Sequence, residues 1–134
     1  MSINEAREAI LARANFVCEL CYGPLTIMSL HHRRPRGMGG TKSPWIHDPE
    51  NLLALCGTGT SGCHGKVESY RDRAYRYGWL VRYGTIPHSV IFADLYGKWW
   101  LLREQEKIEI NLPFEYSNPS SIRPHPSVGL NTTP

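Results

Sequence analysis

Four cysteines form two pairs whose spacing suits a metal site. Two residues separate Cys18 from Cys21 in a turn with Gly and Pro, and Cys56 and Cys63 form a second, wider pair. Two thiolates at the first spacing can converge on one tetrahedral zinc ion. The three glycines between Cys56 and Cys63 allow the chain to fold back there. We therefore expect a closed structural zinc site with all four cysteines as ligands.

Disulfides, or cysteines that are simply buried, are the alternative for this set. The chain opens without a basic region followed by an apolar stretch, and its apolar runs are shorter than the ~18 residues of a membrane helix. These features predict a cytoplasmic protein without a membrane partner. In that compartment thiols are kept reduced, so paired cysteines are more often metal ligands than disulfides.

Histidines occupy the segment that the cysteine pairs bracket. His31 and His32 are adjacent, Asn51 follows, and His64 comes directly after Cys63. Glu68 lies four residues beyond His64, a spacing that places two side chains on one face of a helix. Histidine transfers protons near neutral pH. Imidazole and carboxylate groups together also bind divalent cations.

This ordered set resembles the HNH endonucleases, also called ββα-metal or His-Me finger nucleases. The resemblance covers about residues 16–70, under half of the chain, and this stretch is similar to small HNH proteins common in bacteriophages. The matching stretches are Cys18-Glu19-Leu20-Cys21, residues 30–40, residues 48–56 and residues 62–68.

The resemblance implies metal-dependent hydrolysis of DNA phosphodiester bonds. It assigns His32 as the general base that activates water and Asn51 as the residue that steadies this base. It assigns His31, His64 and Glu68 as ligands of a catalytic divalent cation. Glu68 occupies a position where many relatives have histidine, and a carboxylate moves the preference towards Mg²⁺ or Mn²⁺.

The charge of the chain is modest but unevenly distributed. Fifteen Lys and Arg against twelve Asp and Glu give +3, yet residues 31–42 carry four cations and no acid. Cations beside the proposed site could hold DNA phosphates. The residues expected to do so are Arg33, Arg34, Arg36, Lys42 and Lys66. His47, His88 and His125 fall outside the motif, and we expect them to be surface or structural histidines.

Two classes of function remain open from the sequence. A phage endonuclease would act in genome packaging beside a terminase, in homing, or on host DNA, within the host cytoplasm. The alternative is a non-catalytic, zinc-stabilised DNA-binding or terminase-assisting module. The endonuclease is the leading hypothesis, and the sequence does not choose among its three biological roles.

The predicted fold class is α+β: a small zinc-stapled ββα-metal domain with an N-terminal helix and a C-terminal β extension. The domain spans residues 1–110, with the motif core at 16–70 and the β extension at 79–103. Residues 111–134, rich in Pro, Ser and Asn, are expected to be an extended or disordered tail.

Local patterns predict the individual elements. A capping box, Ser2 to Glu5, opens a helix over residues 3–14. A strand leads into His31 and His32, and residues 51–55 form its return partner. A helix over 64–77 ends at Gly78, and strands follow at 79–83, 90–95 and 98–102. Apolar contexts place three tryptophans in the core: Trp79, Trp99 and Trp100.

Overall fold

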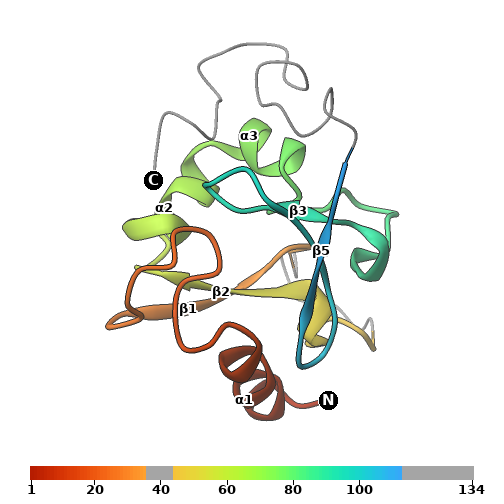
Figure 1. Ribbon diagram of the computed structural model, residues 1–134, viewed down its shortest axis with the longest axis horizontal. Helices are drawn as coiled ribbons and strands as arrows, with labels where there is room; N and C mark the ends of the chain where they lie inside the picture. Colours follow the sequence, from red (N-terminus) through yellow and green to blue (C-terminus); the bar gives the residue numbers. More distant parts are fainter. Residues whose placement is uncertain (36–43, 113–134) are drawn as a thin grey trace.

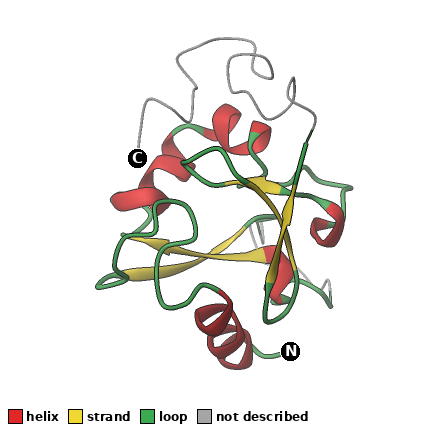
Figure 2. Cartoon of the chain, in the orientation of Figure 1, coloured by secondary structure: helices red, strands yellow, loops and turns green. Residues whose placement is uncertain are grey.

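The computed structural model describes residues 1–35 and 44–112, which form helices and two small antiparallel sheets (Figures 1 and 2). This mixed architecture confirms the α+β class. The elements are α1 (Ile3–Arg13), β1 (Met28–His32), η1 (Pro49–Asn51), β2 (Leu52–Cys56), α2 (Gly62–Ser69), α3 (Arg71–Arg76), η2 (Pro87–Ser89), β3 (Phe92–Ala93), β4 (Trp99–Leu102) and β5 (Lys107–Ile110).

Strands β1 and β2 pair antiparallel, with Met28 opposite Cys56 and His32 opposite Leu52. The consecutive apolar residues of β2 are buried on both faces of this two-stranded sheet. Leu52 and Ala54 pack towards α1, whereas Leu53 and Leu55 join the larger core. Side chains alternate between the two faces of a strand, so an unbroken apolar run fits a strand covered on both sides.

Helix α1 begins with the predicted capping box. The Ser2 hydroxyl accepts a hydrogen bond from the Glu5 amide at 3.2 Å, and the Ser2 amide donates to Glu5 Oε1 at 3.1 Å. Buried Ala6 and Ile10 pack against β2. The helix ends at Arg13, one residue before the predicted end.

A buried ion pair joins α1 to the loop that carries the first cysteines. Arg13 Nη2 lies 2.7 Å from Glu19 Oε1, and both side chains are fully buried. Arg13 also donates to the Pro49 carbonyl at 2.7 Å, while Glu19 accepts from the Ala54 amide at 2.9 Å. These partners compensate the two charges for the loss of water.

The prediction of one helix over residues 64–77 is wrong. Tyr70, at φ −120° and ψ 66°, leaves the helical region and separates α2 from α3. The predicted terminator is correct, because Gly78 follows α3 with φ +76°. A Cβ at Gly78 would lie 2.0 Å from the Ile91 carbonyl oxygen, so only glycine fits.

The predicted C-terminal strands are partly wrong. Residues 79–83 form no strand; they run irregularly beside the end of β1, where the Val81 amide donates to the Arg33 carbonyl at 2.8 Å. The second sheet has the order β3-β4-β5. Strand β3 is shorter than the predicted 90–95, β4 matches 98–102, and β5 was not predicted. The tail prediction falls almost entirely on residues 113–134, which lie outside the described residues.

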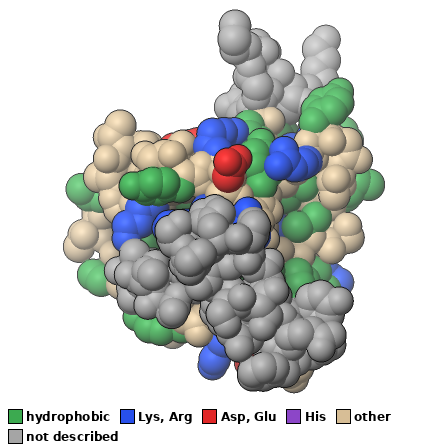
Figure 3. Space-filling model, turned by 90° about the horizontal axis from the view of Figure 1, so that it is seen from above, with side chains coloured by type: hydrophobic (Ala, Val, Ile, Leu, Met, Phe, Trp, Pro, Cys, Tyr) green, Lys and Arg blue, Asp and Glu red, His purple; other side chains and the backbone are tan. Residues whose placement is uncertain are grey.

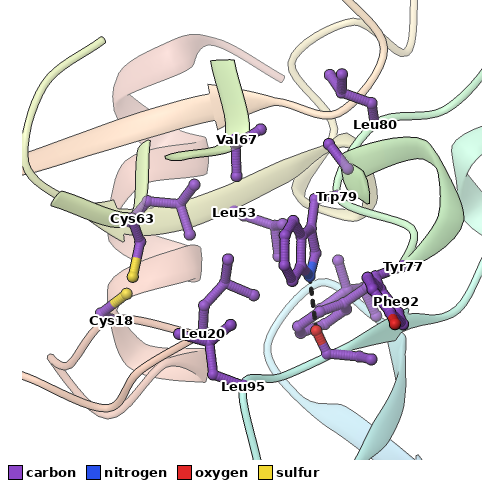
Figure 4. Packing of buried hydrophobic residues seen from close by; sticks show 14 of the residues in the cluster. Cys18, Leu20, Leu53, Cys63, Val67, Tyr77, Trp79, Leu80, Phe92 and Leu95 are labelled. Carbon is purple, nitrogen blue, oxygen red and sulfur yellow. Dashed lines mark hydrogen bonds between the residues drawn. The ribbon is translucent and has the colours of Figure 1, made fainter. Parts of the chain in front are cut away.

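The larger core lies between the two sheets and α2 (Figure 4). Trp79 is buried there and donates its indole N–H to the Ala93 carbonyl at 2.6 Å. Trp99 is also buried, and Trp100 is half-buried against the same cluster. Figure 4 places Cys18 and Cys63 at the edge of this core, so the cysteine cluster adjoins it. Within the described residues, no helix is long and apolar enough to cross a membrane.

Candidate metal centres

The four cysteines come together from three separate elements. Cys18 and Cys21 lie in the loop after α1, Cys56 ends β2, and Cys63 lies in the first turn of α2. Their sulfur atoms all lie within 4.8 Å of one another. All four are free of disulfide bonds. The predicted pairing of the two cysteine motifs is therefore confirmed as a cluster that could hold a metal such as zinc.

Tight turns aim the sulfur atoms at one point. The Gly23 amide donates to Cys21 Sγ at 3.3 Å, and the Cys63 amide donates to Cys56 Sγ at 3.4 Å. In the second turn Gly57 has φ +87°, and a Cβ there would lie 2.1 Å from the Ser61 carbonyl oxygen. Gly62, at φ +62°, is equally crowded by the Cys56 carbonyl, so two of the three glycines identified in the sequence are sterically required, whereas Gly59 has open space around it.

The cluster fits a tetrahedral zinc ion in both size and charge. Zinc–sulfur bonds of about 2.3 Å at tetrahedral angles separate sulfurs by about 3.8 Å, and Cys21 Sγ lies 3.8 Å from Cys56 Sγ. A hydrogen bond from the Cys63 thiol lowers the pKa of Cys18 to about 5, and the same bond raises the pKa of Cys63. Without a cation, the thiolate of Cys18 is therefore favoured at the expense of a thiolate at Cys63. A divalent cation would stabilise the thiolate form of several cysteines at once.

A second cluster combines two histidines and a carboxylate. His31 lies near the end of β1, while His64 and Glu68 lie one turn apart on α2. One ligand atom from each residue lies within 4.8 Å of the others. The His31 and His64 rings are 5.2 Å apart between centroids, and His64 Nε2 is 3.8 Å from Glu68 Oε2. The structure thus brings together the three predicted ligands of the catalytic cation.

Hydrogen bonding fixes the ring of His31. Its Nε2 is 2.7 Å from the Trp79 carbonyl oxygen, which can only accept, so Nε2 carries the proton and the Nδ1 lone pair is left for a cation. His64 Nδ1 is buried and has no hydrogen-bond partner among the described residues. A buried polar atom without a partner is costly, and a bound cation would satisfy it.

Burial keeps both histidines neutral. Desolvation lowers the pKa of His31 to about 3, against a weaker opposing effect of the Trp79 carbonyl. Desolvation also lowers the pKa of His64, although Glu68 opposes the shift. Neutral imidazole is the form that binds metal.

His32, the predicted base, lies at the end of β1 and is half-buried. Its Nε2 is 3.2 Å from His47 Nδ1, and the two rings are 5.3 Å apart between centroids. His47 was expected to be a surface or structural histidine, and its contact with His32 was missed. The sequence feature that could have predicted this contact is the position of His47 itself, a third histidine between His32 and Asn51.

Asn51 is buried and joins the two ends of the loop that follows β1. Its Oδ1 accepts from the Arg34 amide at 2.9 Å, and its Nδ2 donates to the Ile46 carbonyl at 2.9 Å. These two bonds close the loop between Arg34 and Ile46. Its proposed hydrogen bond to the base stays a prediction.

The basic residues predicted to contact DNA have different environments. Arg33 is fully buried, and its guanidinium donates to backbone carbonyls of Gly78, Glu50, Pro87 and Val90. The prediction that Arg33 contacts DNA is therefore wrong, because its donors are already used inside the protein. Arg34 and Lys66 are half-buried at the surface. Arg36 and Lys42 lie outside the described residues.

A third group of potential ligands was not foreseen. His88 Nε2 is 3.0 Å from Asp48 Oδ2 and 3.8 Å from Glu50 Oε1. All three residues are only partly buried, and the contact joins η1 to η2. His88 thus has a structural role as well as a ligand-like environment.

No protein-family model, curated protein or solved structure matches this chain.

Proposed function

We propose that this protein is a metal-dependent DNA endonuclease of the HNH type. The observation that carries the proposal is the convergence of His31, His64 and Glu68, with His32 directly after His31 in β1. The order of elements, an antiparallel strand pair followed by a helix, agrees with a ββα motif. The sequence resemblance then supplies the reaction.

His31, through Nδ1, together with His64 and Glu68 would hold the catalytic cation. Two neutral imidazoles and one carboxylate suit Mn²⁺ or Mg²⁺ in a site that is partly open to solvent. When bound, a divalent cation neutralises the charge that grows on the phosphate and on the leaving oxygen.

His32 accepts the proton of the attacking water. The water oxygen forms a new bond to phosphorus, the bond from phosphorus to the leaving sugar oxygen breaks, and the proton passes to the imidazole. Asn51 holds the backbone on both sides of the loop, so the strand end that carries His32 keeps its position. The cysteine site has no open ligand position and would serve as a structural zinc centre.

Cleavage of supercoiled plasmid tests this function. Purified protein is incubated with plasmid and Mg²⁺, Mn²⁺ or no added cation, beside His32→Ala. We expect nicked or linear product only with a divalent cation, and a loss of about 100-fold or more in His32→Ala, the usual size of a general-base contribution.

His125→Ala, outside the motif, is the matched control and should cleave like the parent. The absence of cleavage with every cation, or full activity in His32→Ala, would contradict the catalytic assignment. Retained DNA binding without cleavage would instead support the non-catalytic DNA-binding module.

A further inference from the structure

Arg34 lies between two aromatic rings directly after the proposed catalytic strand. Its guanidinium carbon is 4.7 Å from the centroid of Trp45 and 4.5 Å from that of Tyr83. Tyr83 is 92% exposed, so its ring gains little from burial. The contact therefore serves mainly to support the arginine, because an aromatic face attracts a cation and limits its motion.

A second group repeats this arrangement on the neighbouring helix. The guanidinium carbon of Arg82 is 4.2 Å from the centroid of Tyr75, and that of Arg71 is 5.9 Å from the same centroid. Arg71 also pairs with Glu68 Oε1 at 3.0 Å. Arg82 and Arg71 are exposed.

The two sets of contacts are linked through the consecutive residues Arg82 and Tyr83, and Arg71 joins one of them to Glu68 of the histidine cluster. Residues 79–83 run along the end of β1, since the Trp79 carbonyl meets His31 and the Val81 amide donates to the Arg33 carbonyl. Arg82 and Tyr83 extend from that segment. The linked contacts run from Glu68 to the loop that Asn51 closes, and we call their residues the arginine–aromatic belt: Arg71, Tyr75, Arg82, Tyr83, Arg34 and Trp45.

We propose that the arginine–aromatic belt binds the phosphate backbone of DNA next to the histidine cluster. The proposal rests on the proposed function, because it names the surface through which the same site receives its substrate. A guanidinium stacked on a ring keeps its N–H edge available for two phosphate oxygens. Because the ring already limits its rotation, less conformational entropy is lost when DNA binds.

The visible face of the molecule agrees with this composition. Figure 3 looks down on the side of α3 and shows Lys and Arg side chains beside hydrophobic and acidic ones on the part that grey atoms leave visible. Basic and aromatic residues next to each other are typical of nucleic-acid surfaces, in which charge provides affinity and rings support it. Arg33, which is fully buried, is excluded from this surface.

Equilibrium binding of a short fluorescein-labelled DNA duplex tests the belt. The His32→Ala background without added divalent cation prevents cleavage, and fluorescence anisotropy is measured over a range of salt concentrations. We expect Arg34→Ala and Arg82→Ala each to raise Kd by about fivefold or more. Each should also reduce the slope of log Kd against log salt by about one, the value for one lost phosphate contact.

Arg7→Ala is the matched charge control, because Arg7 is an exposed cation on α1, on the opposite side of the molecule from α3 (Figure 1). It should leave Kd and the salt slope nearly unchanged. Circular dichroism and zinc content verify that each variant is folded. The belt is overturned if the parent does not bind DNA, or if Arg34→Ala and Arg82→Ala bind like the parent or like Arg7→Ala.

Variants of Tyr83 test the supporting role of the rings. Tyr83→Phe keeps the ring and should bind like the parent, whereas Tyr83→Ala should weaken binding while the net charge stays constant. Equal binding by both variants would contradict the role of the ring.

The binding and cleavage experiments distinguish a failure of the belt from a failure of the endonuclease assignment. If the variants behave as expected but the wild-type protein does not cleave plasmid with any cation, the endonuclease assignment fails and the belt remains. If wild-type protein cleaves plasmid but the arginine variants bind normally, the belt fails and the endonuclease assignment remains.

Discussion

Adjacent residues of the same type have opposite roles at the end of β1. His31 and Arg33 are buried, whereas His32 and Arg34 are half-buried. The alternation of buried and less buried side chains that is typical of a strand therefore continues for two residues beyond the end of β1. The sequence alone favoured exposure for both arginines, because charged side chains are rarely fully buried. The structural role of Arg33 becomes visible only in the folded protein, where its guanidinium donates to backbone carbonyls of segments that are distant in sequence.

Replacing Arg33 with methionine should destabilise the fold. Four backbone carbonyls would lose their donor, so the free energy of unfolding should fall by roughly 3–5 kcal/mol, since each buried acceptor left without a donor costs about 1–3 kcal/mol. Urea denaturation monitored by tryptophan fluorescence measures the change.

Arg34→Met is the matched control for this prediction. Arg34 lies at the surface over two rings, and its loss should cost about 1 kcal/mol or less. Equal, small losses in both variants would contradict the structural role of Arg33.

The ligand residues were more predictable than the groups that orient them. The spacing of His64 and Glu68 already placed both on one helix face. The partner of His31, the Trp79 carbonyl, lies 48 residues away in sequence. No local pattern links these two positions, so burial of His31 and its lowered pKa became visible only in the structure.

At the scale of elements, sequence patterns predicted secondary structure correctly where that structure depends on interactions between residues close together in the chain. The capping box at Ser2, the apolar run of β2 and the glycine after α3 were all predicted correctly. The prediction failed at residues 79–83, whose apolar residues suggested a strand. Trp79, Leu80 and Val81 are buried by contacts with the end of β1 and the core rather than by pairing in a sheet.

The cysteine cluster should contribute much of the stability of its elements, because it joins the loop after α1, β2 and α2. Replacing Cys18 and Cys21 with serine should abolish one tightly bound zinc per chain. It should also lower Tm by about 15 °C or more, since structural zinc supplies folding energy and about 1 kcal/mol shifts Tm by 4–8 °C in a small domain.

Metal analysis after dialysis and differential scanning calorimetry measure these effects. Chelation of the wild-type protein should lower Tm similarly, and stoichiometric Zn²⁺, but not Mg²⁺, should restore it. An unchanged Tm after complete removal of the metal would contradict a structural zinc centre.

At the scale of the whole molecule, two candidate metal centres lie on the unit formed by β1, β2 and α2, and the histidine group is the more exposed to solvent. α2 contributes Cys63 to one and His64 with Glu68 to the other. The sequence predicted this division, because cysteine and histidine ligands alternate along the chain. The belt was not predictable, since Trp45, Tyr75 and Tyr83 meet their arginines only after folding.

The central claim is that a closed zinc site supports a separate, open cation site. Anomalous diffraction from a crystal soaked in Mn²⁺, recorded at the zinc and manganese absorption edges, tests it most directly. We predict a zinc peak between the four cysteines and a manganese peak between His31, His64 and Glu68. Manganese only at Asp48, Glu50 and His88, or no manganese near His31, would contradict the account.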